Sequence, residues 1–292
     1  MCRVRLMTRI RAMASARPTS GTTLLDRDFR GHRSRLADRS SSQLGQDILA
    51  LLVTKWRRGG VFAEVGVGDG TRLSNTLMLE RDYGWTGILI EPNPETHAAI
   101  AASRTAILDR SAACGEDGRM LEFLCATEPD LSTITRYANC DYHNRSGRTV
   151  RVDGDRLGTI LERNGIGALD FLSVDTEGSE REILSVFDFA RYAPALVTVE
   201  HNCVPEAEAG LDALLGANGY DRVLRRRSKC DDVSRVAHTG YRSMAGSEKS
   251  SAQVSSGMAE TPLDLHSREN TDWSCLCATK PLLLHPTSPA RS

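Results

Sequence analysis

Three glycines alternate in one short segment, Glu64-Val-Gly66-Val-Gly68-Asp69-Gly70, which follows a predicted strand and precedes a predicted helix. Glycine lets the backbone turn sharply there and lets a ligand approach the main chain closely. An ordinary tight turn between a strand and a helix would need one or two glycines, not three at alternate positions. We therefore expect a ligand-binding loop at this point of the chain.

A carboxylate ends the next predicted strand, in the segment Ile90-Glu91-Pro92-Asn93. Glu91 lies 21 residues after Gly70, where an acidic side chain can accept hydrogen bonds from both hydroxyls of a ribose. The alternative is a surface glutamate stabilised by the dipole of the helix that follows. The loop and the acid together, at this spacing, predict a site for a nucleoside cofactor.

Two kinds of cofactor fit a loop and an acid of this kind. A dinucleotide site would place its third glycine at position 71, which is Thr71 here. The observed spacing favours S-adenosylmethionine (SAM), whose methionine half has no pyrophosphate to bind. An NAD(P)-binding oxidoreductase is the first alternative, and a methyltransferase-like module without catalytic activity is the second.

Polar residues also end two later strands: Asp175 and Glu177 follow one, and Glu200, His201 and Asn202 follow the next. Both groups should project over the same edge of the sheet, beside the cofactor. Asp175, Glu177 and His201 are candidates for removing a proton from a nucleophile. Asp175, Glu200 and Asn202 could instead bind a hard cation through oxygen ligands. Helix capping explains the neighbouring Ser179 but not Asp175 and Glu177, and a structural role is the alternative for His201.

Short apolar runs and helical stretches alternate along residues 42–233. The runs that predict strands are 61–65, 87–90, 106–108, 169–174 and 195–199. The stretches that predict helices are 44–56, 73–82, 94–103, 155–163, 179–188 and 206–217. Nearly continuous hydrophobicity is typical of strands that are covered on both faces. We therefore predict a single α/β domain with a doubly wound, mostly parallel sheet, whose ligands bind at the carboxyl ends of the strands.

Six motifs follow one another in this region. They are Ser42-Gln43-Leu-Gly45-Gln46-Asp47, Phe62-Ala-Glu64-Val-Gly66-Val-Gly68-Asp69-Gly70, Ser74-Asn75-Thr76 with Leu79-Glu80, Gly84-Trp85-Thr-Gly87-Ile-Leu-Ile-Glu91-Pro92-Asn93-Pro94, Leu169-Asp170-Phe-Leu-Ser-Val-Asp175-Thr-Glu177-Gly178-Ser-Glu180, and Glu200-His201-Asn202. In this order they resemble the FkbM family of methyltransferases.

The resemblance implies a Rossmann-like class I methyltransferase that transfers a methyl group from SAM, usually to a hydroxyl oxygen. The acceptor would be a small molecule or a sugar. The glycine loop would hold the methionine and ribose side of SAM, and the end of the third strand would border the adenine. The residues expected around SAM are Gln46, Glu64, Gly66, Gly68, Asp69, Gly70, Glu91, Pro92, Asn93, Ser111, Ala112 and Asp175.

The acceptor side of the site is less clearly marked. Segment 117–150 shows no regular pattern and carries Tyr137, Tyr142 and His143, so we expect an irregular, acceptor-facing insertion. Mg2+ is a possible second cofactor, if residues 175, 200 and 202 hold a cation. The same groups could equally hydrogen-bond the substrate directly.

Composition argues against two kinds of partner. The net charge is −1 and aromatic residues make up 5% of the chain, so nothing indicates nucleic-acid binding. No apolar stretch reaches the roughly 18 residues that a transmembrane segment needs. The eight cysteines form no CxxC pair, which is typical of reduced thiols in an intracellular protein. The sequence does not indicate an oligomeric state.

Both ends of the chain differ from the core. Residues 1–41 are rich in arginine and carry no acid before Asp26, which is typical of an organellar targeting leader or of a disordered basic arm. The predicted localisation is cytoplasmic, with organellar import as the alternative. Residues 234–292 are polar and show no period, so we expect a disordered tail. The last strand of the sheet, which should begin near Val233, would then be truncated.

Overall fold

The structure is a computed structural model and describes residues 20–141, 143–202, 204–225 and 233–237. All of them lie in the first of two units, Met1–Gly246. The second unit, Ser247–Ser292, falls outside the described residues. The prediction of a disordered tail therefore concerns residues of which the structure describes only a few.

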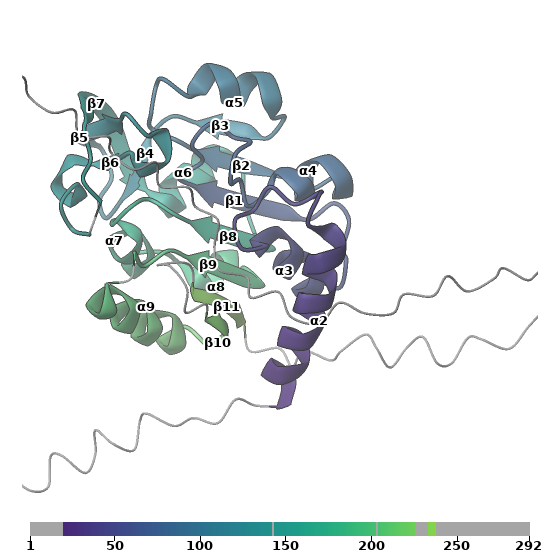
Figure 1. The fold of residues 1–292 in the computed structure, drawn as a ribbon. Helices are drawn as coiled ribbons and strands as arrows, with labels where there is room; N and C mark the ends of the chain where they lie inside the picture. Colours follow the sequence, from purple (N-terminus) through teal and green to yellow (C-terminus); the bar gives the residue numbers. More distant parts are fainter. Residues whose placement is uncertain (1–19, 142, 203, 226–232, 238–292) are drawn as a thin grey trace, which may run out of the picture. The chain divides into compact units, whose positions relative to one another are not determined.

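Among the described residues, seven strands form the main sheet, in the order β10-β11-β9-β8-β1-β2-β3 (Figure 1). They are β1 (Val61–Val65), β2 (Thr86–Ile90), β3 (Ile107–Asp109), β8 (Phe171–Val174), β9 (Leu196–Val199), β10 (Tyr220–Arg225) and β11 (Val233–Ala237). Strands β1, β2, β3, β8 and β9 are parallel, whereas β11 runs antiparallel between β9 and β10. The strand order reverses between β1 and β8, so their carboxyl ends flank the point where such sheets bind ligands.

Helices cover both faces of the main sheet because both faces are apolar. They are α2 (Ser20–Leu36), α3 (Gln46–Val53), α4 (Leu77–Tyr83), α5 (His97–Ser103), α6 (Leu157–Arg163), α7 (Glu180–Ser185), α8 (Phe189–Tyr192) and α9 (Pro205–Ala217). On β2, Leu89 packs in one core with residues of α2 to α5, whereas Ile88 and Ile90 pack in another with residues of α6 to α9. Successive side chains of a strand face opposite sides. The predicted doubly wound, mostly parallel fold is therefore confirmed.

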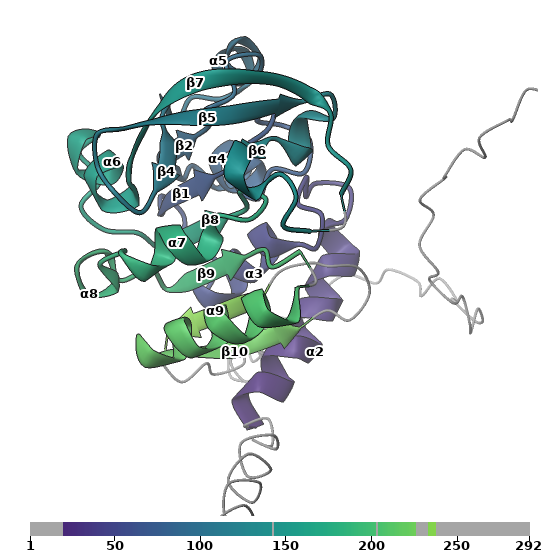
Figure 2. The same cartoon turned by 90° about the vertical axis from the view of Figure 1, so that its left-hand side faces the viewer.

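A second sheet lies in the region that we expected to be irregular (Figure 2). Its strand order is β4-β7-β5-β6. The strands are β4 (Ala112–Cys114), β5 (Arg119–Ala126), β6 (Thr133–Ile134) and β7 (Gly147–Arg156). Two short helices, η2 (Pro129–Leu131) and η3 (Thr135–Tyr137), lie in the connections between these strands. Leu121 and Phe123 of β5 face a small core of their own. On the other face Glu122 is exposed, but so is the apolar Met120, and Leu124 is half-buried, so the alternation of apolar and polar residues is incomplete. The prediction of an irregular segment 117–150 is wrong for this reason.

Part of each predicted tail is folded. Leu25 and Phe29 are buried, and α2, on which they lie, contacts α3 and β10. These two side chains are one helical turn apart, so a narrow apolar stripe runs through a segment whose composition is dominated by arginine. Residues 20–36 are therefore not disordered, while a targeting role for residues 1–19 lies outside the described residues.

The last strand is present as well. Strand β11 pairs with β9 on one side and with β10 on the other, from Val233 to Ala237. The backbone of β11 thus pairs with a neighbouring strand along both edges, although the sequence of β11 is only partly apolar. Strand β11 extends past the boundary that we predicted at residue 233, and the residues after Ala237 lie outside the described residues. Among the described residues, no helix combines the length and the hydrophobicity that a membrane crossing would require.

Candidate functional site

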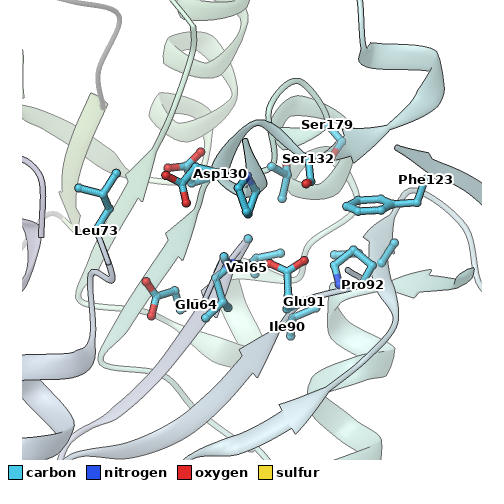
Figure 3. Close-up of a pocket in the computed structure, with 18 of the residues that line it drawn as sticks. Glu64, Val65, Leu73, Ile90, Glu91, Pro92, Phe123, Asp130, Ser132 and Ser179 are labelled. Carbon is cyan, nitrogen blue, oxygen red and sulfur yellow. Dashed lines mark hydrogen bonds between the residues drawn. The ribbon is translucent and has the colours of Figure 1, made fainter. Parts of the chain in front are cut away.

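A cavity opens at the carboxyl ends of β1, β2 and β8, and its other wall comes from the second sheet (Figure 3). It encloses about 760 Å³, including the part open to solvent, which is within the range of small-molecule sites. Seven residues that the sequence predicts for the site line it: Glu64, Gly66, Gly68, Glu91, Pro92, Ala112 and Asp175. The other lining residues are Val65, Val67, Arg72, Leu73, Asn75, Ile90, Ala113, Phe123, Pro129, Asp130, Ser132, Ile134, Thr176 and Ser179.

The glycines of the loop after β1 serve different purposes. Gly66 has a φ of +82°, and a Cβ there would lie 1.6 Å from the backbone oxygen of Asp175. Only glycine therefore lets this loop pass so close to the end of β8. Gly68 lies under Asp130, whose Oδ1 would be 3.1 Å from a Cβ at that position. Gly70 packs against α5 and lies outside the cavity.

Glu91 organises the glycine loop through its carboxylate. Its Oε2 accepts the N–H groups of Val67 (2.8 Å) and Gly68 (2.9 Å), and its Oε1 accepts that of Asn93 (2.9 Å). Burial raises the pKa of Glu91, and these three N–H groups counteract part of that effect. A carboxylate offers about four acceptor positions, so Glu91 can also accept a hydrogen bond from a ligand hydroxyl. Asn93 acts behind the cavity wall and does not line it.

Glu64 is held from behind by a buried network. It accepts hydrogen bonds from residues 74–76, through Ser74 Oγ (3.0 Å), Asn75 N (2.6 Å) and Thr76 Oγ1 (2.5 Å). Arg104 joins this network with a side chain that is fully shielded from solvent. Its guanidinium donates to Gly70 O (2.9 Å) and to Glu80 Oε2 (2.8 Å). Arg104 thus supports the glycine loop, a role that the sequence did not indicate because its partners come from distant segments.

The end of the cavity near the second sheet is apolar. Ala112, Phe123 and Ile134 line it from three strands of that sheet. Ser111, which we expected beside Ala112 at the adenine, turns away from the cavity. Its hydroxyl donates to Asp109 Oδ1 at 2.6 Å instead. Contact of Ser111 with a cofactor stays a prediction.

Two other predicted residues also lie outside the cavity. Gln46 begins α3, and its side chain contacts the hydroxyl of Ser42. Ser42 in turn contacts Asn75 at 2.7 Å, and Asn75 lines the cavity, so Gln46 is one residue removed from it. Asp69 accepts the backbone N–H groups of residues 71 and 72 at 2.7 and 2.8 Å. Both side chains shape the loops around the cavity, and their contact with a cofactor stays a prediction.

Three carboxylates gather where β8 and β9 end, and we call Asp175, Glu177 and Glu200 the acidic cluster. Each offers an oxygen, and these oxygens lie within 4.8 Å of one another. Asn202 contacts the cluster, since its Nδ2 donates to Glu177 Oε2 at 3.3 Å. Among the described residues, no donor reaches Glu200 Oε2 or Asn202 Oδ1, although both atoms are shielded from solvent. The acidic cluster therefore has oxygen acceptors to spare.

Arg145 balances part of this charge. Its side chain is 1% exposed and pairs with Asp141 and Glu177, each at 2.5 Å. Burial, opposed by Arg145 and reinforced by Asp141 and Glu180, raises the pKa of Glu177 to about 7. Burial and the neighbouring carboxylates raise the pKa of Glu200 well above its usual value. Both carboxyl groups of the cluster therefore keep their protons to a higher pH than an exposed glutamate does.

His201 lies in a different cavity from Asp175. This second cavity, of about 470 Å³, is lined by Cys140, Asp141, Gly178, Glu180, Arg181, His201, Asn202, Val204, Ala207 and Leu211. Asp175 of the acidic cluster lines the first cavity, and Asn202, which lines the second, contacts Glu177 of the same cluster. Within segment 117–150, Cys140 and Asp141 line this cavity while His143 is exposed. Tyr142 lies outside the described residues.

Several residues in and around the cavities were not predicted from the sequence. Asn75 had a visible signal, because it stands in the motif Ser74-Asn75-Thr76. Phe123 and Asp130 had none, since they enter the site from a sheet that we did not predict. Arg145 resembled any other arginine of a polar loop until the fold placed it against Glu177.

The strand order, the antiparallel β11 and the glycine loop beside Glu91 define a Rossmann-like class I methyltransferase fold. The chain belongs to the methyltransferase FkbM family, whose domain model matches residues 61–226. The match begins at β1 and ends just after β10, so it includes both cavities and the second sheet. This membership favours the methyltransferase over the NAD(P)-dependent oxidoreductase.

Solved structures with a similar fold have low sequence identity to this chain. The FkbM methyltransferase from Methylobacillus flagellatus is 12% identical, with a TM-score of 0.43 over 61% of this chain and 43% of its own. The chain thus spans less than half of that protein. An O-methyltransferase from Bacillus cereus, solved in complex with SAH, is 11% identical, with a TM-score of 0.35 over 79% of this chain and 97% of its own. No curated protein sequence matches the chain significantly.

Proposed function

We propose that the chain is a SAM-dependent O-methyltransferase whose acceptor is a hydroxyl group of a small molecule or sugar. The supporting observation is the first cavity, which brings together the glycine loop, Glu91 and Asp175 at the switch point of the sheet. Glu91 would bind the ribose hydroxyls there, and the apolar wall around Phe123 would take the adenine. Bound SAM supplies the methyl group as a sulfonium.

The protein's main contribution would be alignment. The acceptor oxygen must lie in line with the sulfonium and about 3–3.5 Å from the methyl carbon. We place the acceptor between the two cavities, because Asp175 lines the first and Asn202, which contacts Glu177, lines the second. Asp175 would face the cofactor, while His201 and Asn202 would face the acceptor from the second cavity.

The acidic cluster would remove the proton of the acceptor hydroxyl. A general base is most effective when its pKa lies near the working pH, and the pKa of Glu177 is about 7. Glu177 or Asp175 would accept the proton as the oxygen attacks the methyl carbon. His201 is the alternative base, since it lines the cavity that we assign to the acceptor.

The same cluster fits a divalent cation such as Mg2+. Hard cations prefer oxygen ligands. Asp175, Glu177 and Glu200 would supply charged oxygens, and Asn202 Oδ1 a neutral one that has no donor among the described residues. This set contains the three residues expected from the sequence and adds Glu177. A bound cation would favour the ionised form of these carboxyl groups and would lower the pKa of an acceptor hydroxyl.

Calorimetry with SAM and SAH tests the cofactor assignment. Wild-type protein should bind both, and Glu91→Ala should weaken binding by about 1–3 kcal/mol, because hydrogen bonds to a charged group are lost. Unchanged affinity in this variant would remove Glu91 from the cofactor site. Mass spectrometry with labelled SAM and a panel of hydroxylated metabolites should then detect a methylated product.

A chelator tests the cation. EDTA should abolish methyl transfer and added Mg2+ should restore it. In addition, Mg2+ should raise the melting temperature of wild-type protein but not that of Glu200→Gln. Activity that is indifferent to EDTA, with no Mg2+-dependent shift in melting temperature, would end the cation proposal and leave direct hydrogen bonding by the acidic cluster.

A further inference from the structure

The chemical character of the first cavity changes along its length. Figure 3 shows Phe123 and Pro92 near one end, Glu91 in the middle, and Glu64 and Asp130 toward the other end. An apolar end suits a flat base, and a charged end suits a charged group. If adenine and ribose occupy the first two parts, the amino-acid end of SAM falls at the third.

The charged side chains that line this cavity differ in how far the protein already satisfies them. Glu64 and Glu91 each accept three hydrogen bonds from neighbouring loops. Asp130 differs, because within the described ranges its hydrogen-bonding partner is the guanidinium of Arg72. Arg72 and Asp130 therefore have more hydrogen-bonding capacity left for a ligand than the two glutamates have.

The position of Asp130 links it to the glycine loop. Its Oδ1 would lie 3.1 Å from a Cβ at Gly68, so it sits directly over that loop. Arg72 follows the same loop in sequence, whereas Asp130 belongs to η2 in the second sheet. The pair thus closes the charged end of the cavity from two sides.

A ligand with charged groups can readily replace the ion pair between Arg72 and Asp130. The side chain of Arg72 is 56% exposed and that of Asp130 is 28% exposed. Ion pairs at such exposure contribute little net stability, because water and salt screen them. A ligand that offers both a carboxylate and an ammonium group can replace each partner at small cost. Arginine is well suited to the carboxylate, which it binds through two parallel hydrogen bonds.

We propose that Arg72 and Asp130 bind the zwitterionic amino-acid end of SAM, Arg72 the carboxylate and Asp130 the ammonium group, in exchange for their mutual ion pair. This inference rests on the proposed function, since it presupposes an adenosyl ligand in the first cavity. It adds two binding residues to the site.

The test compares SAH with 5′-methylthioadenosine, an adenosyl thioether that lacks the amino-acid end. Calorimetry on wild-type protein should show tighter binding of SAH. Arg72→Met and Asp130→Asn should each weaken SAH binding about tenfold, the order expected for a lost charge-assisted hydrogen bond. Binding of methylthioadenosine should change less than about twofold, because it never contacts the pair.

A purely structural role of the Arg72–Asp130 ion pair predicts a different pattern of affinities for the two ligands. If the ion pair only holds η2 over the glycine loop, both ligands should lose affinity together, and the exchange Arg72→Asp with Asp130→Arg should restore both. If the pair binds the zwitterion, the exchanged protein should keep wild-type affinity for methylthioadenosine and lose its preference for SAH. Equal loss for the two ligands, or full rescue by the exchange, overturns the proposal.

Matched controls come from another exposed ion pair. Arg148 pairs with Glu95 at 3.0 Å, and neither residue lines the first cavity. Arg148→Met and Glu95→Gln should leave both affinities unchanged. If wild-type protein binds neither ligand, the proposed function itself fails and this inference fails with it. If wild-type protein binds both and the Arg72 and Asp130 variants do not distinguish them, only this inference is lost.

Discussion

Two pairs of glutamates stand at strand ends of the main sheet, and they differ in how the protein satisfies their oxygens. Glu64 and Glu91, at the ends of β1 and β2, each accept three hydrogen bonds from the surrounding loops. Glu177 and Glu200, after β8 and β9, crowd together with Asp175. At Glu91, three N–H groups counteract the rise in pKa that burial causes, whereas at Glu200 neighbouring carboxylates reinforce it.

The comparison distinguishes carboxylates that have a structural role, Glu64 and Glu91, from carboxylates that are placed for chemistry, the acidic cluster. Carboxylates whose acceptor positions are mostly used hold loops in place and gain stability from doing so. Carboxylates that repel one another cost stability, and proteins retain such arrangements where a proton, a cation or a substrate will use them. We therefore expect changes in the first pair's network to affect folding and changes in the acidic cluster to affect chemistry.

The largest effect should follow from Arg104→Met. This change removes the fully buried guanidinium that lies between Glu64 and Glu80. The two carboxylates then have no cation to balance their charge there. Breaking a buried ion pair in this way costs about 3–5 kcal/mol of unfolding free energy. Urea denaturation measures the loss. Arg148→Met, which removes an exposed arginine, should cost less than about 0.5 kcal/mol. Equal stability of the two variants would mean that the network does not support the loop.

A smaller effect on stability, which depends on pH, should follow from Glu200→Gln. Burial and the charges of Asp175 and Glu177 raise the pKa of Glu200 well above its usual value of 4.5. Above pH 4.5 the unfolded chain ionises Glu200, whereas the folded protein must either keep its proton or place its charge beside the other carboxylates, and the cost to stability grows as the pH rises. Glu200→Gln removes this cost, so the variant should be more stable than wild type by about 1–2 kcal/mol at pH 8 and no more stable at pH 5.

Urea denaturation at both pH values, in the presence of EDTA, measures this difference. Glu206→Gln, an exposed change on α9, is the control and should shift neither curve. Methyl transfer by Glu200→Gln should fall although the fold is stabilised. A variant that is less stable than wild type at pH 8 would show that the acidic cluster is not under electrostatic strain.

The smallest effect should follow from Asp69→Ala. Asp69 lies outside the cavity and accepts the N–H groups of residues 71 and 72, so its loss should cost about 1 kcal/mol of stability. Affinity for SAH should change less than about threefold. Asp69→Asn keeps an acceptor oxygen and should resemble wild type in both measurements. A tenfold loss of SAH affinity in Asp69→Ala would instead make Asp69 a direct contact of the cofactor.

Local sequence was sufficient for the main sheet and for half of the site. Strands β1, β2, β8 and β9 are each a short, mostly apolar run. Polar residues stand at or just after the carboxyl end of each strand. Because parallel strands present their carboxyl ends on one edge, Glu64, Glu91 and Asp175 had to meet there. The glycine loop was visible for the same reason, since its conformation depends on residues that are adjacent in the chain.

Tertiary structure decided the rest, because the remaining contacts join residues that are far apart in sequence. The second sheet supplies Phe123 and Asp130 to the cavity, and its alternation was masked by apolar residues on its outer face. Arg104 and Arg145 acquired partners only when folding removed them from water, where an unpaired charge would be costly. Residue types and their spacing thus determined the fold class and the strand-end acids, whereas burial determined which of those acids are satisfied and which remain reactive.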